Sequence, residues 1–193
     1  MPLLILDRDG VINEDSDDYI RGPADWRPLP GSIQAIANLS KAGYTIAIAT
    51  NQSGLGRGYF SLDELETIHA GLCREVEEMG GHIAGIFYCP HLPGEDCACR
   101  KPGTGLLRAM EAELGLSPRG AIFIGDSLRD LQAARAFGCR PVLVTTGKGA
   151  DTHRVLLGGE AAIADPAAIP VYEDLASAAR EILRNEPAPK SDT

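Results

Sequence analysis

Three things are scarce or missing in this chain of 193 residues, and each absence narrows what the protein can do. Basic residues are few: 18 lysines and arginines stand against 27 aspartates and glutamates, giving a formal charge of −9. A broad basic face for nucleic acid is therefore not expected, because such a face needs clustered lysine and arginine. No apolar run approaches the length of a membrane span, and the chain opens without a basic leader and cleavage site. We therefore expect a cytoplasmic protein without a membrane partner.

The chain also lacks internal repeats and any linker that would divide it. Its length and its hydrophobic content of 44% suit one globular unit with a sizeable core. We expect a single monomeric domain over residues 1–185, followed by a flexible polar tail over residues 186–193.

Short apolar runs alternate with helical patterns along the sequence. Strands are predicted at 3–6, 45–49, 83–88, 121–124 and 141–144. Helices are predicted at 32–43, 61–80, 106–114, 131–137 and 175–183, the first two capped by Ser32 and Ser61. His69, one position off the apolar stripe of its helix, is expected to be partly exposed. Since strands without a polar face need cover on both sides, the sequence predicts an α/β fold with a parallel sheet between helices.

Two carboxylates, Asp7 and Asp9, follow the first strand, and Gly10 lets the backbone turn away from them. Open α/β sheets bind ligands at the carboxyl ends of their strands. Two carboxylates placed there repel each other unless a cation or a shared proton relieves them. The pair therefore indicates a metal-assisted reaction centre, although a surface turn after a strand has the same pattern.

The loop that leaves this strand carries Asp15 and Asp18. These carboxylates either meet the hydroxyl groups of a substrate or form a solvated acidic turn, and the sequence leaves both interpretations open.

Hydroxyl and amide groups follow the second strand: Thr50, Asn51, Gln52 and Ser53. Such groups donate to an anion without adding a titratable group, so this segment suits the oxygens of a phosphate. A plain loop that enters a helix is the alternative, because these residue types favour that position.

Asp126 and Asp130 follow the fourth strand. Asp126 would complete a magnesium site with Asp7 and Asp9, because Mg²⁺ takes one or two carboxylates together with phosphate and water oxygens. Asp130 instead suits a helix cap and ranks below Asp126.

Three of the five cysteines lie in a short loop that also holds a histidine: Cys89, His91, Cys97 and Cys99. They make a complete tetrahedral set for zinc, and a closed four-ligand site leaves no place for substrate, so a structural zinc is expected. A redox cluster or a chance grouping is the alternative.

Arg100 and Lys101 come directly after this loop. Lys101 would neutralise a carboxylate and a phosphate together, and the planar fork of Arg100 would hold a second anionic group. A surface basic pair before a helix is the alternative.

Taken in order, Asp7-x-Asp9, Thr50, Lys101 and Gly125-Asp126-x-x-x-Asp130 resemble the four motifs of the haloacid-dehalogenase-like phosphohydrolases. The residues from Asp7 to Asn13, the cysteine loop and Arg100-Lys101-Pro102 are similar to the zinc-loop group of histidinol phosphatases and heptose bisphosphatases. One departure is Ser127, where many of the heptose enzymes carry lysine.

The resemblance implies a Rossmann-like three-layer sandwich with a central parallel sheet, no cap domain and one zinc-binding loop. It implies a Mg²⁺-dependent phosphatase that removes the C7 phosphate of D-glycero-D-manno-heptose 1,7-bisphosphate, in the synthesis of nucleotide-activated heptose for lipopolysaccharide. Arg100 would recognise the distal phosphate. The alternatives are a histidinol-phosphate phosphatase and a zinc-loop binding module without catalysis.

The same resemblance implies a role for each motif residue. Asp7 would be the nucleophile that forms an aspartyl-phosphate, and Asp9 would protonate the leaving group and then act as base on water. Thr50 and Lys101 would steady the transferring phosphoryl group. Asp126 would hold Mg²⁺ with Asp7 and the backbone carbonyl of Asp9.

Overall fold

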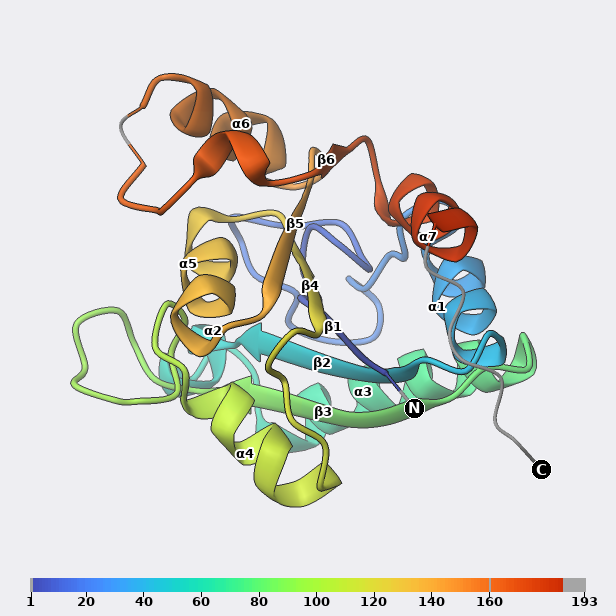
Figure 1. The fold of residues 1–193 in the computed structure, drawn as a ribbon. Helices are drawn as coiled ribbons and strands as arrows, with labels where there is room; N and C mark the ends of the chain where they lie inside the picture. Colours follow the sequence, from blue (N-terminus) through green and yellow to red (C-terminus); the bar gives the residue numbers. More distant parts are fainter. Residues whose placement is uncertain (1, 160, 186–193) are drawn as a thin grey trace.

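The computed structural model describes residues 2–159 and 161–185, which form one parallel sheet with helices on both faces (Figure 1). The strand order is β3-β2-β1-β4-β5-β6, and every neighbouring pair is parallel. The predicted α/β fold is confirmed, while the tail predicted for 186–193 lies outside the described residues. The strands are β1 (Leu3–Leu6), β2 (Thr45–Asn51), β3 (Ile83–Cys89), β4 (Ile122–Gly125), β5 (Arg140–Val144) and β6 (Val171–Tyr172).

Two apolar clusters cover the two faces of the sheet, and β1 contributes to both. Leu4 and Leu6 join the cluster under α1 (Ser32–Lys41), α3 (Leu62–Glu78) and α7 (Leu175–Asn185). Leu3 and Ile5 join the cluster under α4 (Gly105–Leu114) and α5 (Leu128–Phe137). Because successive side chains of a strand point to opposite faces, a central strand covered on both sides must be apolar throughout.

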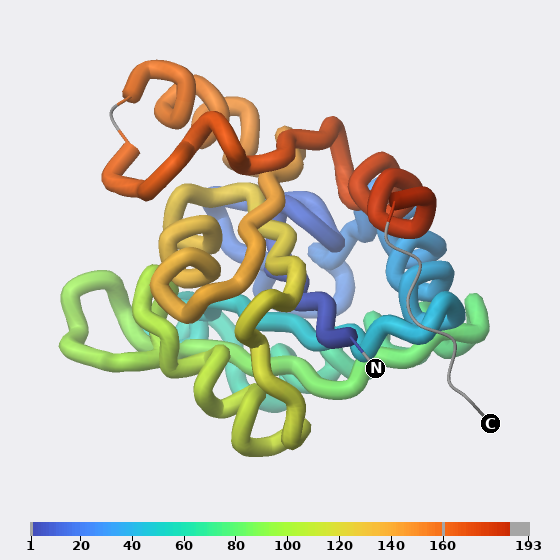
Figure 2. Tube along the Cα trace, in the orientation of Figure 1, coloured from blue at the N-terminus to red at the C-terminus, as the bar shows by residue number. Residues whose placement is uncertain are grey.

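Three shorter elements complete the described fold. They are α2 (Ser53–Gly56), α6 (Gly149–Leu157) and a 3₁₀ turn at Pro166–Ala168. Of these, α6 packs through Leu156 against Leu131 of α5 and Leu143 of β5. The tube in Figure 2 shows that α7 lies beside α1, although the two helices are far apart in sequence. Among the described residues, no helix combines the length and the apolar character that crossing a membrane requires.

Two predictions about single residues were wrong. Ser32 does not cap α1: it is the first helical residue, Gly31 holds the cap position, and the buried Ser32 hydroxyl donates to the Ile12 carbonyl at 2.6 Å. His69 is buried, with 8% of its surface exposed, because α3 turns it toward the sheet. In both cases the side chain contacts a residue from another part of the chain: Ile12 for Ser32 and Arg8 for His69.

The segments between β1 and α1 and between β3 and α4 contain no helix. Both leave the same edge of the sheet as loops, so they border that edge without covering it with a further layer. This agrees with the uncapped site expected from the sequence.

Ile36 tests the packing of α1 on the sheet, because its side chain is fully buried in the first cluster. We expect Ile36→Ala to lower the free energy of unfolding by about 2–5 kcal/mol, through lost burial and an unfilled cavity. Urea denaturation measures this, with Gln34→Ala on the exposed side of the same helix as the control, expected within about 0.5 kcal/mol of wild type. Equal effects of the two substitutions would contradict the packing described.

Candidate active site

The carboxyl ends of β1, β2 and β4 meet at one edge of the sheet and border a cavity of about 300 Å³. β1 lies between β2 on one side and β4 on the other, so the order in which the chain adds strands changes direction at β1. The cavity lies at this point of the sheet. The predicted site residues that line it are Asp7, Asp9, Asp15, Thr50, Asn51, Gln52, Ser53, Arg100, Lys101 and Asp126.

Asp18 is the predicted site residue that the structure sets apart: it is exposed and lines a neighbouring hollow instead. Conversely, Tyr19, Arg129, Asp130 and Lys148 line the cavity. Of these, Lys148 follows β5 directly after Thr145-Thr146-Gly147, so the strand-tip rule used for the other strands would have found it.

Three buried carboxylates, those of Asp7, Asp126 and Asp130, form the floor of the cavity. One oxygen from each lies within 4.8 Å of the others. Burial, then the charge of Asp130, raises the pKa of Asp7 to about 7, although Lys101 opposes the rise. Burial, then the charges of Asp130 and Asp7, raises the pKa of Asp126 to about 8. A hard divalent cation fits this donor set, because it would let these carboxylates ionise together.

Two glycines make room for Asp126. A Cβ atom on Gly10 or on Gly147 would overlap Oδ2 of Asp126, and both glycines have positive φ angles, 80° and 55°. The Thr146 hydroxyl donates to the Gly10 carbonyl at 2.6 Å, and the Lys148 N–H donates to Asp126 Oδ2 at 2.7 Å. The loops after β1 and β5 therefore close around this carboxylate.

Asp130 has two functions in the structure. With Ser127 it forms the capping box of α5. The predicted position was wrong: the helix begins at Leu128 instead of Leu131, so Ser127 holds the cap position and Asp130 is the third residue of the helix. Its other oxygen, Oδ1, lies 2.5 Å from Lys101 Nζ, so the same carboxylate belongs to the floor of the cavity. The sequence suggested only the cap.

Lys101 is buried and reaches the carboxylate floor from the loop before α4. Its Nζ lies 2.9 Å from Asp7 Oδ1 and donates to the Ala49 carbonyl at 2.7 Å. Burial by itself lowers the pKa of Lys101, but the charges of Asp130 and Asp7 outweigh it and raise the pKa to about 12. The ammonium group therefore stays charged beside Asp7.

Asn51 holds the backbone of Lys101 from both sides. The Lys101 N–H donates to Asn51 Oδ1 at 3.0 Å, and Asn51 Nδ2 donates to the Lys101 carbonyl at 3.2 Å. Asn51 borders the cavity, but its amide contacts the protein's own backbone.

Asp9 lies beside the floor and accepts hydrogen bonds from three side chains. Arg8 Nε, Asn13 Nδ2 and Gln52 Nε2 donate to it at 3.0, 2.9 and 2.8 Å. Burial raises its pKa, but the Arg8 charge and these hydrogen bonds outweigh burial and hold the pKa of Asp9 below its ordinary value. Gln52 Nε2 also donates to the Thr50 hydroxyl at 2.9 Å, which ties the strand tips of β1 and β2 together.

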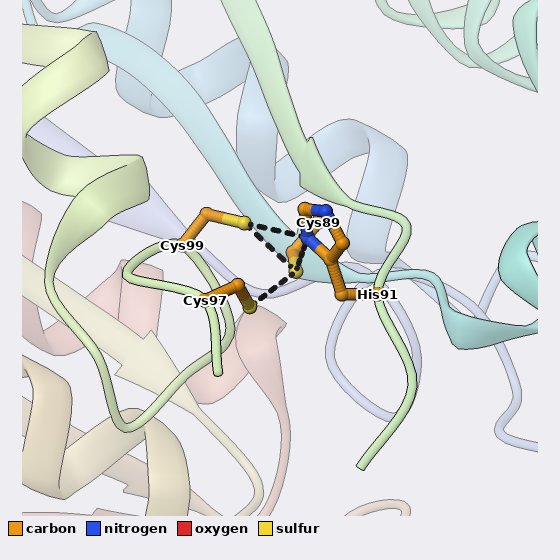
Figure 3. Close-up of side chains that lie close together, drawn as sticks. All are labelled: Cys89, His91, Cys97 and Cys99. Carbon is orange, nitrogen blue, oxygen red and sulfur yellow. Dashed lines mark hydrogen bonds between the residues drawn. The ribbon is translucent and has the colours of Figure 1, made fainter. Parts of the chain in front are cut away.

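The predicted zinc ligands converge in the loop between β3 and α4, and Figure 3 shows their side chains pointing toward one another. Cys89 Sγ lies 3.4 Å from His91 Nδ1, 3.8 Å from Cys97 Sγ and 3.0 Å from Cys99 Sγ. A tetrahedral zinc ion about 2.3 Å from each sulfur would hold its ligands roughly 3.5–3.8 Å apart. The distances from Cys89 to His91 and to Cys97 are close to this range, whereas Cys99 lies nearer, at 3.0 Å from Cys89 and 3.1 Å from His91. The identity of the four donors and their convergence fit zinc, and all of the cysteines are free thiols.

Arg100 connects this cysteine–histidine loop to the mouth of the cavity. Its Nη1 donates to the His91 carbonyl at 3.1 Å. Partial burial, then the nearby charge of Arg129, lowers the pKa of Arg100. Two guanidinium groups at one mouth suit an anionic group on a bound ligand.

Known proteins resemble this chain along most of its length. A family model described as HAD-hydrolase-like matches residues 98–178. The D-glycero-beta-D-manno-heptose-1,7-bisphosphate 7-phosphatase of Pseudomonas putida is 52% identical over 183 residues, which is 95% of this chain and 100% of that protein. The Pseudomonas aeruginosa protein of the same name is 52% identical over 182 residues, 94% of this chain and 98% of that protein.

The crystal structure of the D,D-heptose 1.7-bisphosphate phosphatase from B. bronchiseptica, complexed with magnesium and phosphate, has the same fold. It matches 95% of this chain and 99% of that chain at 46% identity, with a TM-score of 0.87. The motifs and the fold therefore lead to the same group of proteins.

Asp126→Asn tests the crowding of the carboxylate floor. The pKa of Asp126 rises from 3.8 to about 8 in the fold. As the pH rises between these values the unfolded chain loses this proton first, so ionisation favours unfolding of the wild type. Asparagine does not titrate, so in EDTA we expect Asp126→Asn to unfold about 2–4 °C above wild type at pH 8, a gain of about 1 kcal/mol or more. The gain should shrink as the pH falls toward 4.

Magnesium provides the second half of this test, since it should raise the unfolding temperature of the wild type more than that of Asp126→Asn. Glu113→Gln, an exposed carboxylate on α4, serves as the control and should change neither temperature. A lower unfolding temperature for Asp126→Asn than for wild type in EDTA at pH 8 would show that the carboxylates are not in conflict.

Proposed function

The chain belongs to the HAD-like hydrolases and, among them, to the family of the D-glycero-beta-D-manno-heptose-1,7-bisphosphate 7-phosphatases, and from this premise we propose that it hydrolyses the C7 phosphate ester of that sugar. The observation that carries the proposal is the position of Asp7. Its carboxylate lies 2.9 Å from the Lys101 ammonium on the floor of a cavity, where a phosphoryl group can meet both.

The reaction proceeds in two steps. An oxygen of Asp7 attacks phosphorus and the bond from phosphorus to O7 breaks, while a proton from Asp9 passes to O7, giving heptose 1-phosphate and an aspartyl-phosphate. Asp9, now a carboxylate, takes a proton from water, and the resulting hydroxide attacks phosphorus, which releases phosphate and restores Asp7. Lys101 and the Thr50 hydroxyl hold the phosphoryl oxygens.

Binding of the substrate lets Asp9 hold the proton that the first step requires. Arg8 holds the pKa of Asp9 low in the free enzyme, which suits the second step, where Asp9 is the base. A bound phosphate adds negative charge and excludes water near Asp9, and both effects raise a carboxyl pKa. Asp9 can then carry the proton that the first step requires.

Magnesium would be held by Asp7, Asp126 and the backbone carbonyl of Asp9, and when bound it supplies positive charge to the phosphate oxygens. Asp130 stays with Lys101, which it contacts at 2.5 Å. Every group in this scheme comes from one chain, which suits a monomer.

The distal phosphate would lie at the mouth of the cavity against Arg100, with Arg129 beside it. Asp15, Asn51, Gln52 and Ser53 border the space left for the sugar. Zinc in the cysteine–histidine loop would be structural, because four protein ligands complete its coordination. Asp18 is exposed away from this cavity and has no part in the scheme.

A panel of substrates tests the proposed reaction. With Mg²⁺ we expect the highest kcat/KM, measured by phosphate release, for the β anomer of D-glycero-D-manno-heptose 1,7-bisphosphate, above the α anomer and histidinol phosphate. Asp7→Asn should abolish turnover while the circular dichroism spectrum and the zinc content stay those of the wild type.

A higher kcat/KM for histidinol phosphate would show that the proposed substrate is wrong. Full activity of Asp7→Asn would show that Asp7 is not the nucleophile. Silence toward all phosphate esters, together with salt-dependent binding of nucleic acid, would favour a binding module.

Loss of zinc should affect Arg100 more than Lys101. Arg100 contacts the loop through the His91 carbonyl, whereas Lys101 is held by Asn51, Asp7 and other groups outside it. We expect Cys97→Ser to raise the KM for the bisphosphate about 10-fold or more, the effect of one lost charge-assisted contact. The kcat/KM for p-nitrophenyl phosphate, which has no distal phosphate, should stay within about 3-fold of wild type.

Arg100→Met is the matched control, and metal analysis should show that it retains zinc. It should lose the preference for the bisphosphate over p-nitrophenyl phosphate to a degree similar to that of Cys97→Ser. Equal losses of Cys97→Ser on both substrates would mean that the loop supports the whole site instead.

A further inference from the structure

The buried guanidinium of Arg8 connects Asp9 to a helix outside the cavity. Arg8 has no exposed surface, and its Nε and Nη2 donate to the two carboxylate oxygens of Asp9 at 3.0 and 3.1 Å. On the other side, Arg8 Nη1 lies 3.2 Å from Nε2 of His69 on α3. Among the described residues, α3 contributes none to the cavity wall. One of the three side chains that donate to Asp9 is therefore itself in contact with a residue that does not line the cavity.

The contact fixes the chemical state of His69. A guanidinium has donors and no acceptor, so Nε2 of His69 must accept and the proton of the neutral ring must be on Nδ1. Burial, then the charge of Arg8, lowers the pKa of His69 to about 3, so the ring is neutral at physiological pH. His69 therefore acts as a fixed acceptor for Arg8.

The location of His69 on α3 gives the acceptor a rigid support. α3 begins with a capping box formed by Ser61 and Glu64, and its apolar face packs into the larger core cluster. The ring of Tyr88, on β3, is a neighbour of the His69 ring, with 6.0 Å between the two ring centroids. Without this acceptor, Arg8 would keep a buried donor unpaired and would shift toward another oxygen.

We propose that His69 is a positioning residue that fixes Arg8 and, through it, the Asp9 carboxylate at the leaving-group oxygen, an inference that rests on the role proposed for Asp9 above. The affected event is the first step: the Asp9 proton moves to the ester oxygen as that oxygen takes the electron pair of the broken bond to phosphorus. A displaced Asp9 delays this transfer, and the delay matters only where the leaving group needs the proton.

Two substrates with different leaving groups separate this role from a structural one. A sugar alkoxide needs protonation to leave, whereas p-nitrophenolate is stable as an anion and leaves without it. In His69→Leu and His69→Phe, which have no acceptor, we expect kcat/KM for the bisphosphate to fall about 10-fold or more. The kcat/KM for p-nitrophenyl phosphate, which reports the same first step, should stay within about 3-fold of wild type. His69→Gln, which retains an acceptor, should restore the bisphosphate value to within about 3-fold.

Val76→Ala, at a buried position about two turns beyond His69 on α3, controls for lost stability and should leave the ratio of the two kcat/KM values unchanged. His69→Leu and His69→Phe both remove the acceptor, and His69→Phe also keeps a planar ring in the same place. A kinetic result from either variant, provided that it folds, is enough to test the proposal. Equal losses on both substrates, no loss on either, or no rescue by His69→Gln would overturn the proposal.

Failure of the proposed function gives a different result. In that case the wild type would not hydrolyse the bisphosphate, and the comparison of His69 variants would proceed with whichever alkyl phosphate it does hydrolyse, against p-nitrophenyl phosphate.

Discussion

The site depends on an imbalance of charge at the switch point of the sheet. Asp7, Asp126 and Asp130 bring three carboxylates together where water is largely excluded, and Lys101 supplies one buried positive charge against them. Burial, together with the neighbouring carboxylates that one ammonium group does not offset, raises the pKa values of Asp7 and Asp126. A folded chain that keeps this arrangement sacrifices stability for a place where a cation and a phosphate dianion bind well together.

The surrounding structure holds each group by separate means. Asn51 and the carboxylates fix Lys101, and the cysteine–histidine loop fixes Arg100. Asp9 is fixed by a third set of contacts, from Arg8, Asn13 and Gln52. Asn51 and Gln52 are neighbours at the end of β2, but they hold different groups. We therefore expect a substitution in one set of contacts to affect mainly one function: transfer of the phosphoryl group, recognition of the distal anion, or movement of a proton.

The sequence predicted the sheet and most of the site because both follow from local patterns. Apolar runs located five strands, and parallel strands bring their carboxyl ends to one edge, so Asp7, Thr50 and Asp126 had to meet. What local patterns cannot show is a partner from a distant segment. The second contact of Asp130 with Lys101 and the burial of His69 against Arg8 both depend on tertiary packing.

The close packing of Gly10 and Gly147 on Asp126 also limits which substitutions the protein can accept at these two positions during evolution. Neither position contributes a functional group, yet a single methyl group at either would take the space of an acid on which the chemistry relies. Mutational drift at these two codons should therefore be as restricted as at the acids themselves. Related proteins that keep this chemistry should therefore keep the charged residues and also keep glycine at both positions.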